Sequence, residues 1–131
     1  MIKYELIIID DDVITHFILK KMIERNPFFP RPFFFENAVD AIHFLKRNHS
    51  SKTRFLIFLD INMPTMSGWQ FLSEINDCFS ILNLSIVMIS SSKDDIDISK
   101  ALQNKYVIHF ITKPLKHSDL LIIQYKYKDI F

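Results

Sequence analysis

The chain has 131 residues, of which 49% are hydrophobic and 24% charged, and its formal net charge is +1. These values predict one globular domain with a hydrophobic core, exclude a disordered chain, and give no reason to expect binding to nucleic acid or to a membrane surface. Cys78 is the only cysteine, which excludes an internal disulfide, and the apolar run near the N-terminus is too short for a signal peptide or a membrane span, so we expect a cytoplasmic protein.

Strand and helix patterns alternate from the start of the chain. Residues 6–9 form an isoleucine-rich apolar run that predicts a buried parallel strand, and Asp10 follows it directly. The next apolar residues recur at helical spacing and predict the inward face of a first helix: Ile14, Phe17, Ile18 and Met22. The Asn26-Pro27 pair predicts where this helix ends.

A short strand and a second helix come next. Phe33–Phe35 is expected at the edge of the sheet because several prolines precede it, and proline cannot donate to a strand ladder. Asn37 predicts the N-cap of the following helix. The apolar residues of that helix fall on one face: Ala38, Ala41, Ile42 and Leu45.

The middle of the chain contains an apolar run at residues 55–59 that predicts a buried strand ending at Asp60. Gly68, the only glycine, follows after a short turn. We expect it where no other residue fits, either in a turn with positive φ or where two backbone segments approach closely. Trp69 and Leu72 then mark a third helix.

The second half repeats the alternation. Residues 84–89 predict a fourth buried strand followed by three serines, residues 95–104 a weaker helix, and residues 107–111 a fifth strand. His117 or Ser118 opens a last helix whose inward residues are expected to be Leu120, Leu121 and Ile123. Strands alternating with helices in this way predict an α/β fold, with a parallel sheet covered on both faces by right-handed crossovers.

Polar residues stand where these strands end. Asp10 and Asp11 follow the first strand, Asp60 ends the third, Ser90 the fourth, and Lys113 follows the fifth. The carboxyl ends of parallel strands share one edge, so these side chains are expected to converge on one crevice. Crowded carboxylates favour a hard cation, Mg²⁺ or Mn²⁺. An aspartate beside such a cation, with a lysine and a hydroxyl nearby, is equipped to accept a phosphoryl group.

Four segments carry a resemblance to a known family: IIIDDD (7–12), LDINMPTMSG (59–68), VMISSS (87–92) and FITKPL (110–115). In this order and at this spacing the chain resembles the receiver domain of two-component response regulators, of the stand-alone, chemotaxis-regulator-like kind. The resemblance implies a flavodoxin-like, doubly wound sheet of five parallel strands in the order 2-1-3-4-5 with five helices. It further implies a single receiver domain over residues 1–131.

The resemblance also assigns roles in the crevice. Asp60 would be the phosphoacceptor, and Lys113 would pair with the phosphoryl oxygens. Asp11, Asp60 and the backbone carbonyl of Asn62 would bind Mg²⁺ directly, whereas Asp10 would assist through water. Receivers of this family carry a cis bond before the proline that follows the lysine, so we predict a cis Lys113-Pro114 bond.

Ser90 and Phe110 would form the switch by the same resemblance, as the hydroxyl and the aromatic residue that respond to phosphorylation. The chain departs from the family in two places. Tyr106-Val107 stands where many receivers have Gly-Ala, and Ala38 stands where a glycine often opens the second helix. The first departure concerns the loop after the fourth helix, and therefore the output surface rather than the chemistry.

The implied function is a phosphorylation-driven signalling switch without a DNA-binding or enzymatic output domain. Its phosphodonor would be a histidine kinase or a histidine phosphotransfer protein, and its output a downstream protein target. It would not be an enzyme beyond catalysing its own phosphorylation and dephosphorylation. A phosphorylation-dependent homodimer is left open.

Two other functions compete with this interpretation. Asp10 and Asp12 form an acid-x-acid pair at a strand end, as in haloacid-dehalogenase-type aspartyl-phosphate phosphatases, but only Asp119 and Asp129 follow Lys113 as late acids. A pseudo-receiver that acts only as a binding module is the other alternative, and the intact acids and lysine argue against it. For Asp12 itself, a helix N-cap is the better interpretation.

Overall fold

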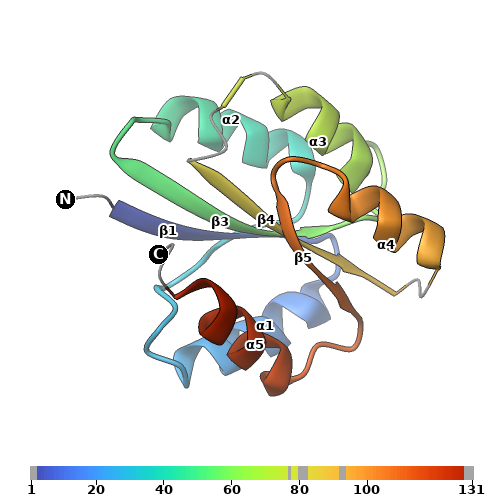
Figure 1. Ribbon diagram of the computed structural model, residues 1–131. Coiled ribbons are helices and arrows are strands. Elements are labelled where there is room, and N and C mark those ends of the chain that lie inside the picture. Colours follow the sequence, from blue (N-terminus) through green and yellow to red (C-terminus); the bar gives the residue numbers. More distant parts are fainter. Residues whose placement is uncertain (1–2, 77, 80–82, 92–93, 129–131) are drawn as a thin grey trace.

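The computed structural model describes residues 3–76, 78–79, 83–91 and 94–128, and over these residues five strands alternate with five helices. All strands are parallel and form one sheet in the order β2-β1-β3-β4-β5 (Figure 1). The strands are β1 (Lys3–Ile9), β2 (Phe33–Phe35), β3 (Thr53–Asp60), β4 (Leu84–Ser90) and β5 (Val107–Thr112). The helices are α1 (Val13–Glu24), α2 (Ala38–Asn48), α3 (Gly68–Ile75), α4 (Asp95–Leu102) and α5 (His117–Tyr127). The predicted fold and strand order are confirmed.

The sheet separates two hydrophobic clusters. Helices α2 and α3 cover one face and α1 and α5 the other (Figure 1). Side chains of β3 alternate between the clusters, as neighbours in a strand must: Ile57 packs toward α2 and α3, and Phe58 toward α1 and α5. The residues of β1 and β3 that line both clusters have no exposed surface, which explains why their sequences are continuous apolar runs.

Strand β2 lies at the edge of the sheet, as the prolines before it predicted. It is held to β1 in parallel register, with Ile8 opposite Phe34. The side chain of Asn37 caps α2 by accepting a hydrogen bond from the backbone N–H of Asp40, and the four apolar residues predicted to face inward on α2 are all buried. The sequence analysis of this segment is confirmed.

Gly68 is present because two backbone segments meet, and its φ is not positive. A Cβ atom placed on Gly68 would lie 2.7 Å from the carbonyl oxygen of Asp60 and 2.9 Å from the Cα of Ile61. The Gly68 N–H donates to the carbonyl of Ile61 over 2.8 Å. Of the two expected reasons for this glycine, close approach is therefore correct, and it packs the start of α3 directly against the end of β3.

The predicted inward face of α1 is wrong for Ile14, Phe17 and Ile18, which are exposed, whereas Met22 is partly buried against the core as expected. Ile14 and Phe17 are 65% and 62% exposed, whereas the buried residues of the helix are Thr15, Leu19 and Ile23. Helix α1 is thus apolar on two sides, and the side that contacts the sheet is not the one with the more regular pattern. The same correction applies to Leu121 of α5, which is half-exposed.

No helix in the described part of the chain is both long and apolar enough to cross a lipid bilayer.

Candidate functional site

The predicted polar residues meet at the carboxyl edge of the sheet, and backbone hydrogen bonds between neighbouring strands fix their positions. Asp10 lies just beyond β1, and its N–H donates to the carbonyl of Phe35 over 3.0 Å. Asp60 ends β3. Ser90 ends β4, is fully buried, and its carbonyl accepts from the N–H of Lys113 over 2.8 Å. Ile9 of β1 pairs with Leu59 of β3, and Asp60 pairs with Ile89 of β4. Strand pairing therefore holds the ends of β1, β3, β4 and β5 next to one another at one edge of the sheet.

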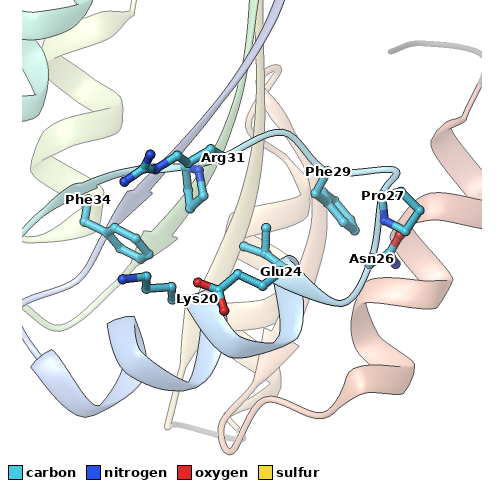
Figure 2. A pocket seen from close by; sticks show the side chains of 9 residues that line it. Lys20, Glu24, Asn26, Pro27, Phe29, Arg31 and Phe34 are labelled. Carbon is cyan, nitrogen blue, oxygen red and sulfur yellow. The ribbon is translucent and has the colours of Figure 1, made fainter.

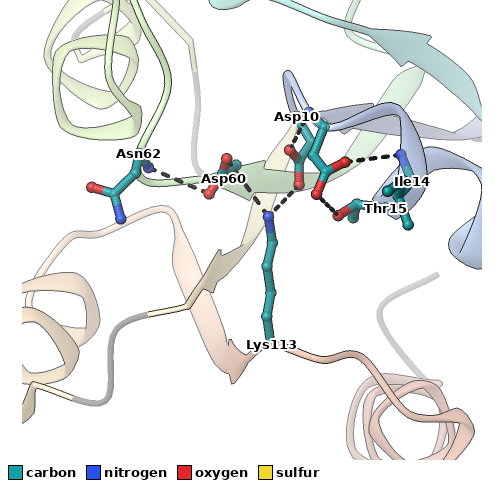
Figure 3. Close-up of polar contacts among 7 residues, drawn as sticks. Asp10, Ile14, Thr15, Asp60, Asn62 and Lys113 are labelled. Carbon is teal, nitrogen blue, oxygen red and sulfur yellow. Dashed lines mark hydrogen bonds and ion pairs between the residues drawn. The ribbon is translucent and has the colours of Figure 1, made fainter.

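Lys113 is the centre of the side-chain arrangement (Figure 3). Its Nζ lies 2.9 Å from a carboxylate oxygen of Asp10 and 3.7 Å from one of Asp60. Asp10 has no exposed surface and Asp60 has almost none, so both carboxylates depend on protein contacts for compensation of their charge. The site brings together the predicted lysine and two of the three predicted aspartates by direct contact.

The pKa of Asp60 is raised to about 7: burial is the largest cause and the nearby Asp10 carboxylate adds to it, while Lys113 and the Asn62 backbone N–H act in the opposite direction. Burial alone would lower the pKa of Lys113, but its hydrogen bond to Asp10 and the charges of the nearby aspartates outweigh burial and raise that pKa. Without a further cation, the crevice therefore holds more negative charge than one ammonium group compensates.

Asp11 completes a cluster of three carboxylates. Its side chain is exposed, and one carboxylate oxygen from each of Asp10, Asp11 and Asp60 lies within 4.8 Å of the other two. Oxygen donors at this mutual distance fit a hard divalent cation such as Mg²⁺ or Mn²⁺. It is the only cluster of three or more potential metal ligands among the residues that the structure describes.

Asp12 has the structural role expected of it. Its carboxylate caps α1 by accepting from the N–H of Ile14 over 2.9 Å and contacts the Thr15 hydroxyl at 3.4 Å. Its own N–H donates to Asp10 over 2.8 Å and helps to fix the Asp10 carboxylate (Figure 3). Asp119 lies in the first turn of α5 and accepts a hydrogen bond from the N–H of Lys116. Among the described residues, neither Asp12 nor Asp119 therefore adds a second acidic pair to the site. Asp129 lies outside the described residues.

The loop between β3 and α3 borders the site. The N–H of Asn62 donates to the Asp60 carboxylate over 3.3 Å, which places the Asn62 backbone beside the cluster. Thr65 in the same loop has a φ of 68°, a value that is rare for a β-branched residue. The sequence predicts a short turn before Gly68, but it does not predict a positive φ at Thr65.

The switch candidates lie on the two strands next to Asp60. Ser90 is buried at the end of β4, and Phe110 of β5 is partly buried against the cluster under α2 and α3, opposite Met88 in the strand register. The last serine of the predicted motif, Ser92, lies outside the described residues. The Lys113-Pro114 bond is cis, as predicted.

A hollow of about 520 Å³ elsewhere on the molecule shares no residue with this site. It lies between α1 and the segment that leads into β2, with Lys20 and Glu24 on the helix and Arg31 and Phe34 on the other side (Figure 2). The hollow is therefore separate from the polar residues that meet at the carboxyl edge of the sheet.

An exposed apolar surface adjoins the site, and three of its residues, Ile14, Phe17 and Ile18, were predicted to face the core. Val13 begins α1 immediately after Asp12, and Ile14, Phe17 and Ile18 continue the exposed apolar surface along the helix. The helical spacing of these apolar residues is visible in the sequence, but it does not show that they face water. Leu19 and Ile23 on α1 also have helical spacing, and they are the residues that are buried.

Comparison with known proteins agrees with the geometry. The sequence matches the family described as "Response regulator receiver domain" over residues 6–123. It is 28% identical to an uncharacterized response regulatory protein of Staphylococcus epidermidis (89% of this chain, 43% of that protein) and 26% identical to the transcriptional regulatory protein HptR of Staphylococcus aureus (92% and 44%). The chain thus spans less than half the length of these two relatives.

Solved structures give the same result for the whole fold. The structure is similar to a two-component response regulator from Cytophaga hutchinsonii, with a TM-score of 0.82, 25% identity, and coverage of 98% of this chain and 99% of that one. It is also similar to a CheY-like receiver domain protein from Methanospirillum hungatei, with a TM-score of 0.73, 25% identity, and coverage of 97% and 96%. Because the family match covers most of the sequence and includes every residue of the site, the chain belongs to the response regulator receiver domain family.

Proposed function

We propose that this protein is a phosphorylation-dependent signalling switch in which Asp60 accepts the phosphoryl group. The observation that carries the proposal is the contact of one ammonium group, Lys113, with the buried carboxylates of Asp10 and Asp60. A carboxylate oxygen of Asp60 attacks the phosphorus, the bond from phosphorus to the donor breaks, and the donor leaves with that electron pair. The product is a mixed anhydride, which water cleaves by attack at phosphorus with release of inorganic phosphate.

The residues around Asp60 have separate roles in this step. Lys113 contacts both aspartates and would pair with a phosphoryl oxygen on Asp60. Asp10, Asp11, Asp60 and the backbone carbonyl of Asn62 would hold the metal ion. Mg²⁺, when bound, supplies positive charge that offsets the crowded carboxylates and the developing charge on the phosphoryl oxygens.

Transmission of the signal is assigned to Ser90 and Phe110. A phosphoryl group on Asp60 adds negative charge and acceptor oxygens beside the end of β4. The Ser90 hydroxyl can donate to one of these oxygens and draw the following loop inward. Phe110 then turns toward the vacated space, which changes the surface formed by α4, β5 and α5.

The phosphodonor is proposed to be a histidine kinase or a histidine phosphotransfer protein that docks on the exposed apolar surface of α1. A protein donor must bring its phosphohistidine to Asp60. Val13 and Ile14 follow Asp12 at the start of α1, Phe17 lies one turn further along the helix, and all three are more than half exposed. An apolar surface of this kind is typical of protein contacts. Phe17→Ala should then slow transfer from a phosphorylated protein donor and leave transfer from acetyl phosphate unchanged; equal slowing of both would remove α1 from the docking surface.

The proposal treats residues 1–131 as a single receiver domain, since both clusters of the core pack on one sheet. It places the protein in the cytoplasm, where Cys78, a free and exposed thiol, would remain reduced. Its downstream target is a protein that distinguishes the two phosphorylation states. The named activities of the longer relatives are not assigned to this chain.

The test is which aspartate carries the phosphoryl group. Asp60→Asn should abolish labelling by a small phosphodonor. Asp10→Asn should weaken Mg²⁺ binding and slow labelling but leave the label on Asp60. In a haloacid-dehalogenase-type enzyme, Asp10 would be the nucleophile, and Asp60→Asn would still be labelled.

A further inference from the structure

The hollow between α1 and the segment that leads into β2 has walls that the fold holds in place (Figure 2). Asn26, which is 6% exposed, fixes the turn after α1. Its side-chain oxygen accepts from the N–H of Phe28 over 3.0 Å, its amide nitrogen donates to the Gln124 side chain of α5 over 2.9 Å, and its backbone carbonyl accepts from the N–H of Phe29 over 3.2 Å. Prolines at positions 27, 30 and 32 restrict the backbone of this segment further. The cavity is therefore largely formed in the free protein, and a ligand has little to order on binding.

The floor of the hollow is apolar. Ile23 of α1 and Phe29 of the following segment line it, and they are only 4% and 5% exposed. Phe29 packs edge-on against Phe58 of β3 with 6.4 Å between the ring centres, so this part of the floor is continuous with the core. Phe34 of β2 forms another wall, and its ring centre lies 5.0 Å from that of His16. A volume of about 520 Å³ above such a floor is within the range of cavities that hold small organic molecules.

Charged side chains of both signs surround this apolar floor. Lys20 and Glu24 lie one turn apart on α1, and Arg31 lies across the hollow from them on the segment before β2 (Figure 2). All three are exposed, and no ion pair joins any of them to another residue that the structure describes. The hollow therefore offers two cations, one carboxylate and an apolar surface to a single ligand.

We infer that this hollow binds a small zwitterion with an apolar body, the class of ligand to which hydrophobic amino acids belong. The ligand carboxylate pairs with Arg31, whose guanidinium can donate two parallel hydrogen bonds, and with Lys20. The ligand ammonium pairs with Glu24, and the apolar body covers Ile23 and Phe29. A ligand with one charge would leave the opposite group of the cavity partly desolvated and without a partner, which is the physical reason for preferring a zwitterion. The inference does not depend on the proposed function, because the hollow shares no residue with the phosphorylation site.

Three probes of similar shape test the two charges separately. L-phenylalanine carries both charges, phenylpropionate lacks the ammonium, and phenylethylamine lacks the carboxylate. Each is titrated into isotope-labelled protein, and the amide signals of residues 20–34, which include the lining of the hollow, report binding by two-dimensional NMR. L-phenylalanine should shift these signals saturably. Each probe with one charge should bind at least about tenfold more weakly, because it loses one charge-assisted hydrogen-bonding group.

Two variants identify the groups that recognise the charges. Arg31→Gln should weaken the binding of L-phenylalanine and phenylpropionate, which share the carboxylate, and leave that of phenylethylamine unchanged. Glu24→Gln should weaken the binding of L-phenylalanine and phenylethylamine and leave that of phenylpropionate unchanged. Lys21→Gln is the matched control, since it removes a cation from the same helix, but Lys21 does not line the hollow and its Nζ lies 5.6 Å from the centre of the Phe17 ring. All three substituted positions are exposed, so the variants should fold as the wild type does.

Several results would overturn the inference. If L-phenylalanine shifts no signal of residues 20–34, or if the three probes bind equally, the hollow does not recognise a zwitterion. Binding of phenylpropionate as tight as that of L-phenylalanine would remove Glu24 from the site and exclude the zwitterion with it. An equal loss of L-phenylalanine binding in Lys21→Gln and Arg31→Gln would show a general effect of charge and would also refute the site. Asp60→Asn should bind L-phenylalanine as the wild type does, so failure of the proposed function would not change these results.

Discussion

The ammonium nitrogen of Lys113 lies 2.9 Å from the carboxylate of Asp10, a side chain with no exposed surface. This contact is the main compensation for a buried charge at the end of β1. Its partner is not equally buried, because 19% of the Lys113 side chain remains exposed. The same ammonium is 3.7 Å from Asp60, so one cation serves two acids.

Lys113→Met should therefore destabilise the metal-free protein. Removing one partner of a buried ion pair costs about 3–5 kcal/mol, and we expect about 2–4 kcal/mol here because Lys113 is partly exposed. Urea unfolding with a chelator measures the loss, and Mg²⁺ should restore part of it by supplying another positive charge. The control, Lys46→Met on the exposed side of α2, should change the free energy of unfolding by less than about 0.5 kcal/mol. Equal effects of the two variants would show that the contact is unimportant for stability.

The stability of the metal-free protein should fall as pH rises toward neutrality, because of Asp60. Its pKa is about 7 in the folded protein, compared with about 3.9 in an unfolded chain. Below the lower value both states are protonated. Between the two values the unfolded chain gives up a proton that the folded protein retains, so unfolding becomes more favourable with rising pH, and the effect is complete above the folded pKa.

The measurement is urea unfolding of wild type and Asp60→Asn in chelator, at about pH 5 and about pH 7.5. Wild type should lose stability relative to the variant between the two, since the variant cannot ionise at this position and all other groups cancel in the comparison. Mg²⁺ should reduce or reverse the difference. If the free energies of unfolding of the two proteins changed with pH in parallel, ionisation of Asp60 would not destabilise the folded protein.

Gly68→Ala should impair both the stability and the chemistry. Its Cβ would meet the Asp60 carbonyl at 2.7 Å and the Ile61 Cα at 2.9 Å, and because both are backbone atoms the end of β3 would have to move. Overpacking of this kind costs about 1–3 kcal/mol. The rate of phosphorylation by acetyl phosphate should fall with it, since the displaced backbone carries the acceptor.

The matched control is Ser67→Ala, one residue earlier. The Ser67 side chain caps α3 by accepting from the N–H of Gln70, and its loss costs about 1 kcal/mol without moving β3. Ser67→Ala should therefore lower the melting temperature and keep the wild-type labelling rate. Normal labelling of Gly68→Ala would show that the Asp60 backbone tolerates displacement.

Ser90→Ala should leave phosphorylation of Asp60 intact but weaken its effect on the affinity for a downstream partner. Asp60 remains available in this variant, so labelling persists, but the hydroxyl that would reach the phosphoryl oxygen is gone. Coupling between two sites is typically about 1–3 kcal/mol, so a downstream partner should bind the two states of the wild type with affinities that differ by roughly 5- to 150-fold. Titration of the partner into each state should give a smaller ratio for the variant. An unchanged ratio would mean that the signal follows another route.

The sequence was sufficient for the fold because the strands of a parallel sheet buried on both faces are continuous apolar runs. It was also sufficient for the main residues of the site, because Asp10, Asp60 and Lys113 each stand directly at the end of such a run, and the sheet brings those ends to one edge. Strand β3 begins at Thr53, two residues before the predicted apolar run. Thr53 and Arg54 pair with β1 through backbone groups, which every residue has, so their side chains give no sign of the strand.

The sequence did not predict which side of a helix faces the core. Helix α1 has two apolar sides, and only the packed structure shows that Leu19 and Ile23 face the sheet while Phe17 faces water. Gly68 was recognised as special, but close approach and positive φ leave the same mark in a sequence. Tyr106 was noted as a departure from the family, yet its hydroxyl lies within hydrogen-bonding distance of backbone carbonyls at and just after the end of α3, about thirty positions earlier, which no local pattern records.

The most direct test of the account is to locate the phosphoryl group chemically. The protein is incubated with acetyl phosphate and Mg²⁺ and then reduced with borohydride, which converts an aspartyl phosphate to homoserine, and the modified position is found by peptide mass spectrometry. The account predicts modification at Asp60 alone, dependent on Mg²⁺ and absent in Asp60→Asn. Modification at Asp10, or an equal yield at Asp60 when Mg²⁺ is replaced by a chelator, would contradict it.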